Sequence, residues 1–404
     1  MTPRTLPLLL VLAALLAIPA PADAQQTARP QVGQPVEQAG QLLKQKKYKE
    51  ALGKLAAADA VPEKTPYERH IIEGTRAAID MNSGDYTGAA KALQADIATG
   101  ILSPQDTLVR LQSVVQLDYQ LKNYPQTVAD ATRYYQQGGT ANDPRLLIAQ
   151  AYFLQNDYAN AAKTIRTIIA VDDHTGKKPD EQVLLTLLNS EFQMKDTAGR
   201  VDTLERLIAA YPKKDYWTDL LNTVGQKPGF ASRLALDLDR LKLAAGVLTK
   251  PSDYMDAAQL AVLAGLPDDA KTIVDKGTAV GVFANAADAD RAKRLTTLAA
   301  TQAADDAKTL AKRESDAAAA PNGLAWEKLG ETYASDGQYD KAIAAYQKAI
   351  QKGGLQNPED AKLHLGLAYL AAGQKAPARQ TLAGVAGTDG TRDLAQLWLL
   401  QGTI

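Results

Sequence analysis

The feature that most constrains the fold is a pattern of large and small apolar residues between positions 321 and 382. It begins with Trp326, Leu329, Gly330 and Tyr333, and a related pattern starts at Gly366, 36 residues after Gly330. The first pattern continues at intervals of two to four residues through Gly337, Tyr339, Ala342, Tyr346 and Ala349. Bulky and small residues in this order let two antiparallel helices pack closely, and then pack on the next pair. The pattern therefore predicts stacked helical hairpins.

A weaker form of the same pattern occurs earlier in the chain. An aromatic residue that would open the second helix of each hairpin recurs at Tyr48, Tyr86, Tyr124 and Tyr158, at intervals of 38, 38 and 34 residues. A small residue follows three places later in each case, at Ala51, Ala89, Thr127 and Ala161. This period and pattern resemble the tetratricopeptide repeat, whose usual period is about 34 residues. The resemblance implies an all-α fold, an α-solenoid of antiparallel helical hairpins, with regular repeats at both ends and degenerate ones in the centre.

The first 24 residues have the features of a secretory signal peptide. Arg4 precedes an apolar run from Leu6 to Ile18, and Ala22-Asp23-Ala24 provides a small-residue cleavage site. The run is too short for a spanning helix, which needs about 20 apolar residues. We expect Sec-dependent export to the periplasm as a soluble protein, with secretion as an alternative, and no membrane span after cleavage.

The remainder is expected to divide into four segments. These are a disordered leader at 25–34, an N-terminal repeat array at 35–212, a degenerate helical-hairpin segment at 213–320, and a C-terminal repeat pair with a capping helix at 321–404. Pro212, the Lys227-Pro228-Gly229 break and the Pro321 region mark the changes. Within 213–320, we expect separate helices at Asn285–Ala303 and Asp305–Ala318.

Composition argues against several functions. The net charge of −1 provides no field that would gather nucleic acid. The chain has no cysteine, and its three histidines, at positions 70, 174 and 364, lie far apart in the sequence. Phosphate-binding and nucleophile motifs are absent, and Asp172, Asp173 and His174 suggest no further metal ligand. We therefore expect no cofactor, no metal, no catalytic residue and no enzymatic activity.

The repeat pattern also indicates where a partner would bind. In proteins with this repeat, the first helix of each hairpin lines a concave groove. Carrying over the groove-facing positions gives Gln112, Gln116, Tyr119, Leu146, Gln150, Phe153, Glu327 and Glu331. Amides beside aromatic rings would suit an extended peptide, because amides can pair with its backbone and rings can accept apolar side chains. Tyr119 and Phe153 could equally be ordinary hairpin core.

A second resemblance comes from the central segment. Residues 211–221, the Lys227-Pro228-Gly229-Phe230 turn and Arg240-Leu241-Lys242 are similar to a family of exported proteobacterial repeat proteins, often found alongside TonB-type energy-transduction components. The resemblance implies a periplasmic interaction module. We therefore expect a non-catalytic scaffold that binds another envelope protein through the groove and is linked to TonB-dependent transport. The alternative is a periplasmic binding protein for a peptide or a polysaccharide.

Overall fold

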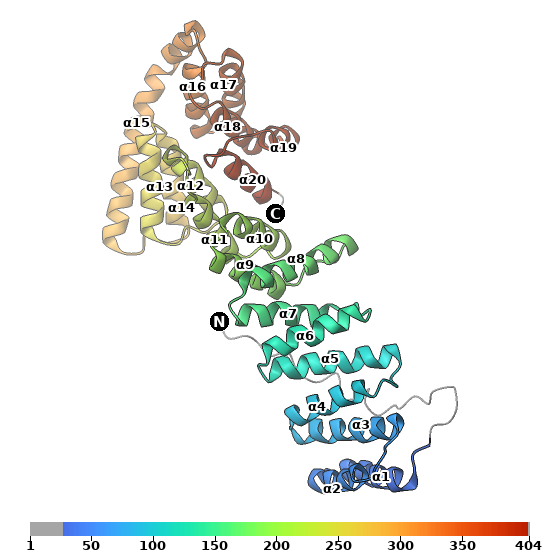
Figure 1. Cartoon of the computed structure of the whole chain (residues 1–404). Coiled ribbons are helices and arrows are strands. Elements are labelled where there is room, and N and C mark those ends of the chain that lie inside the picture. The colour runs from blue at the N-terminus through green and yellow to red at the C-terminus, as the bar shows by residue number, and fades with distance from the viewer. Residues whose placement is uncertain (1–26, 403–404) are drawn as a thin grey trace. The chain divides into compact units, whose positions relative to one another are not determined.

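The structure is a computed structural model of the chain, and it describes residues 27–402 (Figure 1). Over these residues the chain forms helices joined by turns and contains no strand, which confirms the expected all-α fold. The chain divides into two compact units between Met194 and Lys195. Unit 1 ends at Met194 and unit 2 begins at Lys195. The expected signal peptide at 1–24 lies outside the described residues.

Unit 1 is a stack of helical hairpins. Its described residues form α1 (Pro30–Lys44), α2 (Tyr48–Asp59), α3 (Pro66–Ser83), α4 (Tyr86–Ala98), α5 (Pro104–Gln120), α6 (Tyr124–Gln136), α7 (Asn142–Leu154), α8 (Tyr158–Thr175) and α9 (Glu181–Met194). Each odd-numbered helix from α1 to α7 packs on the next helix to form a hairpin, and each hairpin packs on its successor. Among the odd-numbered helices, α5 also touches α7, and α7 touches α9. This is the solenoid arrangement expected from the repeat pattern.

The turns inside these hairpins share one local geometry. Two positions before each second helix, the backbone enters the left-handed region, at Lys46, Gly84, Lys122 and Asn156, with φ of 61, 84, 61 and 61°. At two of the turns an aspartate follows, and the side chains of Asp85 and Asp157 accept a hydrogen bond from the backbone N–H three residues on. These contacts satisfy donors that a helix start leaves unpaired. The recurring turn therefore gives successive hairpins the same orientation of their side chains.

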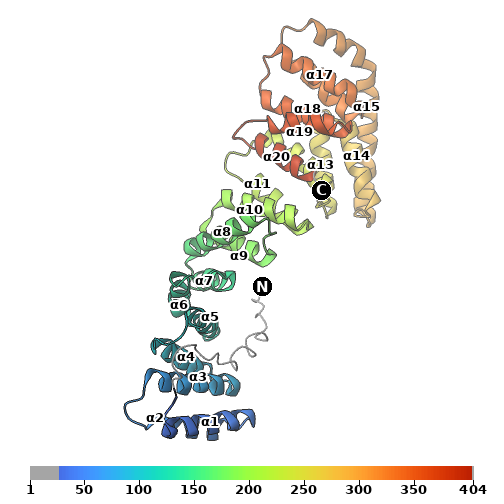
Figure 2. The ribbon, with the colours of Figure 1, turned by 90° about the vertical axis from the view of Figure 1, so that its right-hand side faces the viewer.

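Unit 2 contains two hairpins with the stronger repeat pattern and a less regular part before them. Its described residues form α10 (Thr197–Ala210), α11 (Lys214–Gly225), the short 3-10 helix η2 (Ser232–Leu234), α12 (Ala235–Ala244), α13 (Pro251–Leu263), α14 (Pro267–Ala279), α15 (Ala286–Ala319), α16 (Leu324–Ser335), α17 (Tyr339–Lys352), α18 (Pro358–Ala371), α19 (Lys375–Ala383) and α20 (Thr391–Gln401). The chain of unit 2 closes on itself, because α20 packs against α12. Helix α20 also packs against α18 and α19, beside which Figure 2 shows it.

Two elements differ from the expectations. Helix α1 begins at Pro30, so part of the expected leader is helical, because proline is well suited to the first turn of a helix. The two helices expected before residue 319 are one continuous helix of 34 residues, α15. Asp305 and Asp306 lie in its middle, where Asp305 pairs with Lys308 at 2.7 Å. No glycine or proline interrupts α15, so nothing ends it at the expected point.

The C-terminal hairpins depend on close approach at glycine. Gly330 of α16 faces the fully buried ring of Tyr346 on α17, and a β-carbon there would lie 2.7 Å from the ring. Gly366 of α18 approaches Leu382 of α19 in the same way, and a β-carbon there would lie 2.5 Å from the leucine side chain. Glycine thus lets the two helices of each hairpin approach more closely than any larger residue would allow.

We expect Gly330→Ala to destabilise unit 2 by about 1–3 kcal/mol, because the methyl group overpacks the contact with Tyr346. Urea unfolding followed by tryptophan fluorescence would measure this, since Trp217, Trp326 and Trp398 all lie in unit 2. As a control, Gly40→Ala in α1 meets no atom within 4 Å. Its helix should gain roughly 0.5–1 kcal/mol, measured by circular dichroism. An unchanged Gly330→Ala midpoint would contradict the role assigned to the glycine.

Candidate partner-binding surfaces

The six expected groove residues of unit 1 occupy equivalent places on two neighbouring helices. Gln112, Gln116 and Tyr119 lie on α5, and their counterparts Leu146, Gln150 and Phe153 lie on α7. All six side chains are partly exposed, whereas neighbours such as Leu111 and Ala151 are fully buried in the hairpin. We call these six residues the first-helix face. The structure therefore brings the six residues onto neighbouring helices, as the repeat pattern predicts.

The two rings of the first-helix face also belong to the packing of their hairpins. The Tyr119 ring lies 5.9 Å, centroid to centroid, from Tyr124 at the start of α6, and the Phe153 ring lies 5.3 Å from Tyr158 at the start of α8. Tyr119 also packs beside the buried cluster that includes Val115, and burial raises the pKa of its phenol. Each ring is thus held in a fixed orientation by the hairpin while part of it stays exposed.

The same register continues to α9, which the sequence reasoning missed. There it gives Leu185, Asn189 and Phe192, and Phe192 is 58% exposed. The register inferred from the sequence relied on the tyrosine that opens each second helix, but Thr197 takes that place in α10. The N-cap aspartate was the usable signal, because Asp196 accepts a hydrogen bond from the Gly199 N–H as Asp85 and Asp157 do at their own turns.

A buried carboxyl pair lies directly behind Tyr119. Asp118 of α5 and Asp130 of α6 are both buried, and the Gln94 and Gln126 amides donate hydrogen bonds to Asp130 at 3.2 and 2.8 Å. Burial and the neighbouring Asp130 carboxyl raise the pKa of Asp118 to about 7. Near neutral pH Asp118 is therefore protonated in about half of the molecules, and in that form it can donate to the Asp130 carboxylate.

Glu327 and Glu331, the expected groove residues of unit 2, lie on α16 in a different setting. Both are half-buried, and Glu331 pairs with Lys328 at 2.7 Å. Burial raises the pKa of Glu327, and the nearby Glu331 carboxylate adds to that effect, while His364 of α18 opposes it. The two carboxylates thus belong to an electrostatic network that includes a histidine of the next hairpin.

Helix α12 and the turn before it contact this part of the C-terminal repeats. Asp237 of α12 is bonded to the imidazole of His364 through both its oxygens, at 3.1 Å each. Arg233 of η2 donates to Asp360 at 2.7 and 2.9 Å and to Asp389 at 2.6 Å. Burial opposes protonation of His364, but the Asp237 carboxylate outweighs it and raises the pKa of the imidazole. A segment of the chain itself therefore occupies polar groups of α18 that a partner would otherwise contact.

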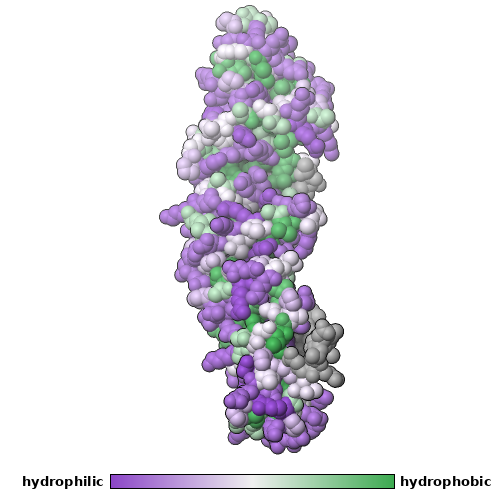
Figure 3. All heavy atoms as spheres, turned by 45° about the vertical axis from the view of Figure 1, so that its right-hand side comes forward, coloured by the Kyte–Doolittle hydropathy of each residue, from purple (hydrophilic) through white to green (hydrophobic). Residues whose placement is uncertain are grey.

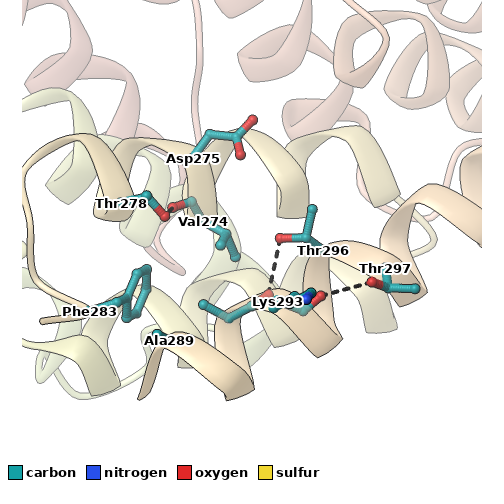
Figure 4. Close-up of a pocket in the computed structure, with 9 residues that line it drawn as sticks. Val274, Asp275, Thr278, Phe283, Ala289, Lys293, Thr296 and Thr297 are labelled. Atoms are coloured by element: carbon teal, nitrogen blue, oxygen red, sulfur yellow. Dashed lines mark hydrogen bonds between the residues drawn. The ribbon is translucent and has the colours of Figure 1, made fainter. Parts of the chain in front are cut away.

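A cleft of about 370 Å³ between α14 and α15 is lined by Val274, Phe283 and several threonines (Figure 4). The hydroxyls of Thr296 and Thr297 donate to carbonyls of their own helix, and Asp275 pairs with Lys271. Within residues 27–402, no His, Cys, Asp and Glu side chains gather as a metal site. These threonine hydroxyls and the Asp275 carboxylate are thus engaged within the protein, while Lys293 also lines the cleft.

On the face that Figure 3 shows, apolar residues form separate patches among hydrophilic ones. Each described helix is too short or too polar to cross a membrane.

Comparison with known proteins supports the repeat assignment for the C-terminal residues. Residues 333–404 match the model of the tetratricopeptide repeat family. No curated protein matches the chain. Similar solved structures include the TPR2AB domain of yeast Sti1 in complex with pHSP90, at 12% identity over 74% of this chain and 99% of that chain, with a TM-score of 0.25. Naa15/Naa10 bound to HypK-THB is 14% identical over 89% and 58%, with a TM-score of 0.31. The TPR domain of P58(IPK) is 16% identical over 85% and 98%, with a TM-score of 0.23.

We expect Asp118→Asn to remove a pH dependence from the stability of unit 1. The folded pKa of Asp118, about 7, exceeds its unfolded value of roughly 3.9. Its stabilising effect is therefore complete below pH 4 and is lost as pH rises through 7. An asparagine amide keeps the hydrogen bond to Asp130 at every pH.

The variant should be more stable than the parent at pH 9, by roughly 1–3 kcal/mol, with the difference shrinking towards pH 5. Circular dichroism melts at pH 5, 7 and 9 would measure this. The exposed Asp143→Asn controls for the loss of one charge. If the stability of Asp118→Asn and of the parent changed with pH in the same way, the raised pKa of Asp118 would be disproved.

We expect Arg233→Ala to destabilise unit 2 by about 1–3 kcal/mol, because it leaves the buried Asp360 carboxylate without its cation, at a site only partly shielded from water. Lys271→Ala removes the exposed pair with Asp275 and should change stability by less than about 1 kcal/mol. Urea unfolding followed by tryptophan fluorescence compares the two variants. Equal effects would show that the contact between η2 and α18 contributes no more than a surface pair.

Proposed function

We propose that this protein is a non-catalytic scaffold of the cell envelope that binds another protein through the first-helix face of unit 1. The observation that carries this proposal is the row of partly exposed, uncharged side chains at equivalent positions of α5 and α7. Repeats of this kind present a continuous binding surface, because each hairpin adds the same positions to it.

The site of action within the proposal is the periplasm. It rests on the signal-peptide features of residues 1–24, with an arginine, an apolar run and an Ala22-Asp23-Ala24 site. The likeness of the central segment to exported proteins found near TonB-type components suggests a partner in TonB-dependent transport. We place Glu327 and Glu331 in this proposal as secondary contacts, because the groups around them are already engaged with α12 through His364.

A second candidate function is the capture of a free peptide or a polysaccharide in the same compartment. It is favoured by the combination of Gln116 and Gln150 amides with the Tyr119 and Phe153 rings. Amides can bond to a peptide backbone or to sugar hydroxyls, and rings can pack against apolar side chains or sugar faces. The two functions differ in whether a folded envelope protein is retained on the face.

The test is a crosslinked pull-down of the exported chain from a bacterial envelope extract, read by mass spectrometry. We expect one or two enriched envelope proteins that Tyr119→Ala with Phe153→Ala no longer captures. Loss of both rings removes the largest apolar surface of the first-helix face, and aromatic residues commonly dominate binding energy. Leu263→Ala with Leu298→Ala, which removes two exposed apolar side chains elsewhere, should capture normally.

Folding of each variant is checked by circular dichroism. If the alanine variant unfolds, Tyr119→Leu with Phe153→Leu keeps apolar volume in the hairpins and removes the rings. If a folded variant that lacks both rings captures the partner as well as the parent does, the first-helix face is excluded as the binding surface. Enrichment of no protein at all would overturn the scaffold and direct attention to the second candidate.

A further inference from the structure

The first-helix face of α5 and α7 continues onto α9 in unit 1, and none of the side chains at these positions is charged. With α9 included, it comprises Gln112, Gln116 and Tyr119 of α5, Leu146, Gln150 and Phe153 of α7, and Leu185, Asn189 and Phe192 of α9. All nine side chains are at least partly exposed. Protein surfaces are roughly 25–35% charged, so nine such positions would ordinarily include about two or three charges. A partner segment that meets this face is therefore expected to be uncharged where it touches.

The nine residues form ordered rows across the helices. The middle position is an amide on every helix, namely Gln116, Gln150 and Asn189, and the last is a ring on every helix, namely Tyr119, Phe153 and Phe192. Tyr124 and Tyr158 hold the first two rings in place. Each amide in this row offers both a hydrogen-bond donor and a hydrogen-bond acceptor, which a surface that binds only apolar groups would not need. The partner must therefore offer backbone groups to the amides and apolar groups to the rings, at a repeating interval.

The spacing of the helices sets that interval. Helix α5 contacts α7, and α7 contacts α9. The axes of helices packed in this way generally lie about 8–10 Å apart. A polyproline II segment has three residues per turn and rises about 3.1 Å per residue, so its side chains return to one face every ~9 Å. The side chains of an extended strand return to one face every ~6.7 Å, so by the third helix they no longer align with the rings of the protein. The interval thus favours the polyproline II conformation over a strand.

A bound helix could match the interval but not the amide row. Residues seven apart on an α-helix are about 10.5 Å apart, but the backbone groups of a helix are bonded to each other. In polyproline II the backbone has no internal hydrogen bonds and remains available. Segments rich in proline also lose little entropy on binding, and aromatic surfaces are their usual docking partners.

We propose that the first-helix face of α5, α7 and α9 binds an uncharged, proline-rich segment of a partner protein in the polyproline II conformation, with an apolar residue at every third position. The rings of Tyr119, Phe153 and Phe192 receive these apolar residues, and the amides of Gln116, Gln150 and Asn189 bond to the backbone between them. This inference rests on the proposed function and specifies the partner's chemistry.

The test measures binding of fluorescent synthetic peptides to the exported chain by anisotropy. Three neutral 12-residue peptides are compared: one with proline at every third position, one with the same composition in scrambled order, and one of alternating threonine and valine. We expect the first to bind at least tenfold more tightly than the other two. Gln116→Ala with Gln150→Ala should weaken it by about tenfold, since each lost hydrogen bond contributes modestly. Gln136→Ala with Gln137→Ala removes two exposed amides at the end of α6 and should bind normally.

Other outcomes would overturn the inference. Equal binding of the ordered and scrambled peptides would refute the three-residue register, and preference for the threonine–valine peptide would indicate strand-like binding. Binding of a neutral β-linked hexasaccharide in place of every peptide would assign the face to glycans. If no peptide binds but an envelope protein is still captured through Tyr119 and Phe153, this inference fails and the scaffold stands. If neither is bound, both fail. Circular dichroism confirms that each variant is folded.

Discussion

Close packing between the two helices of a hairpin is the constraint on which the rest of the structure depends. Where Gly330 meets the ring of Tyr346, one side supplies no side chain and the other supplies a large one. This contact positions the two helices, the turn between them repeats the arrangement, and the outward positions then fall in rows. The two hairpins of unit 1 from α5 to α8 pack without such a glycine, but their repeated turn likewise puts equivalent residues of α5 and α7 at equivalent positions.

Much of this architecture could be predicted from periodicity. The spacing of Tyr86, Tyr124 and Tyr158 located second helices correctly, because each of these tyrosines is the first residue of its helix. Asp305 and Asp306 misled the prediction, since a pair of acids is as compatible with a solvated mid-helix surface as with a helix start. Where Thr197 replaces the usual tyrosine, the register was lost, and with it the α9 part of the candidate face.

The contact between α12 and the C-terminal repeats could not be predicted at all. Asp237 and His364 are 127 residues apart, and no local pattern relates them. The apolar periodicity of α12 predicts a helix but not which polar face it meets. For the same reason the sequence placed Glu327 and Glu331 on a groove without showing that His364, their neighbour, is bonded to another helix of the chain.

The closure of unit 2 on itself bears on how the chain acquires its structure. In the described part of unit 1, the main contacts of each hairpin are with its neighbours, so these contacts are close in sequence and can form progressively as the chain is made. In unit 2 the contacts of Lys227 and Arg233 with Asp393 and Asp360 join residues 166 and 127 positions apart. Such a closure carries a larger entropic cost and cannot occur until the final helix is present. Folding of unit 2 is therefore expected to be slower than folding of unit 1 and to require α20 to be present.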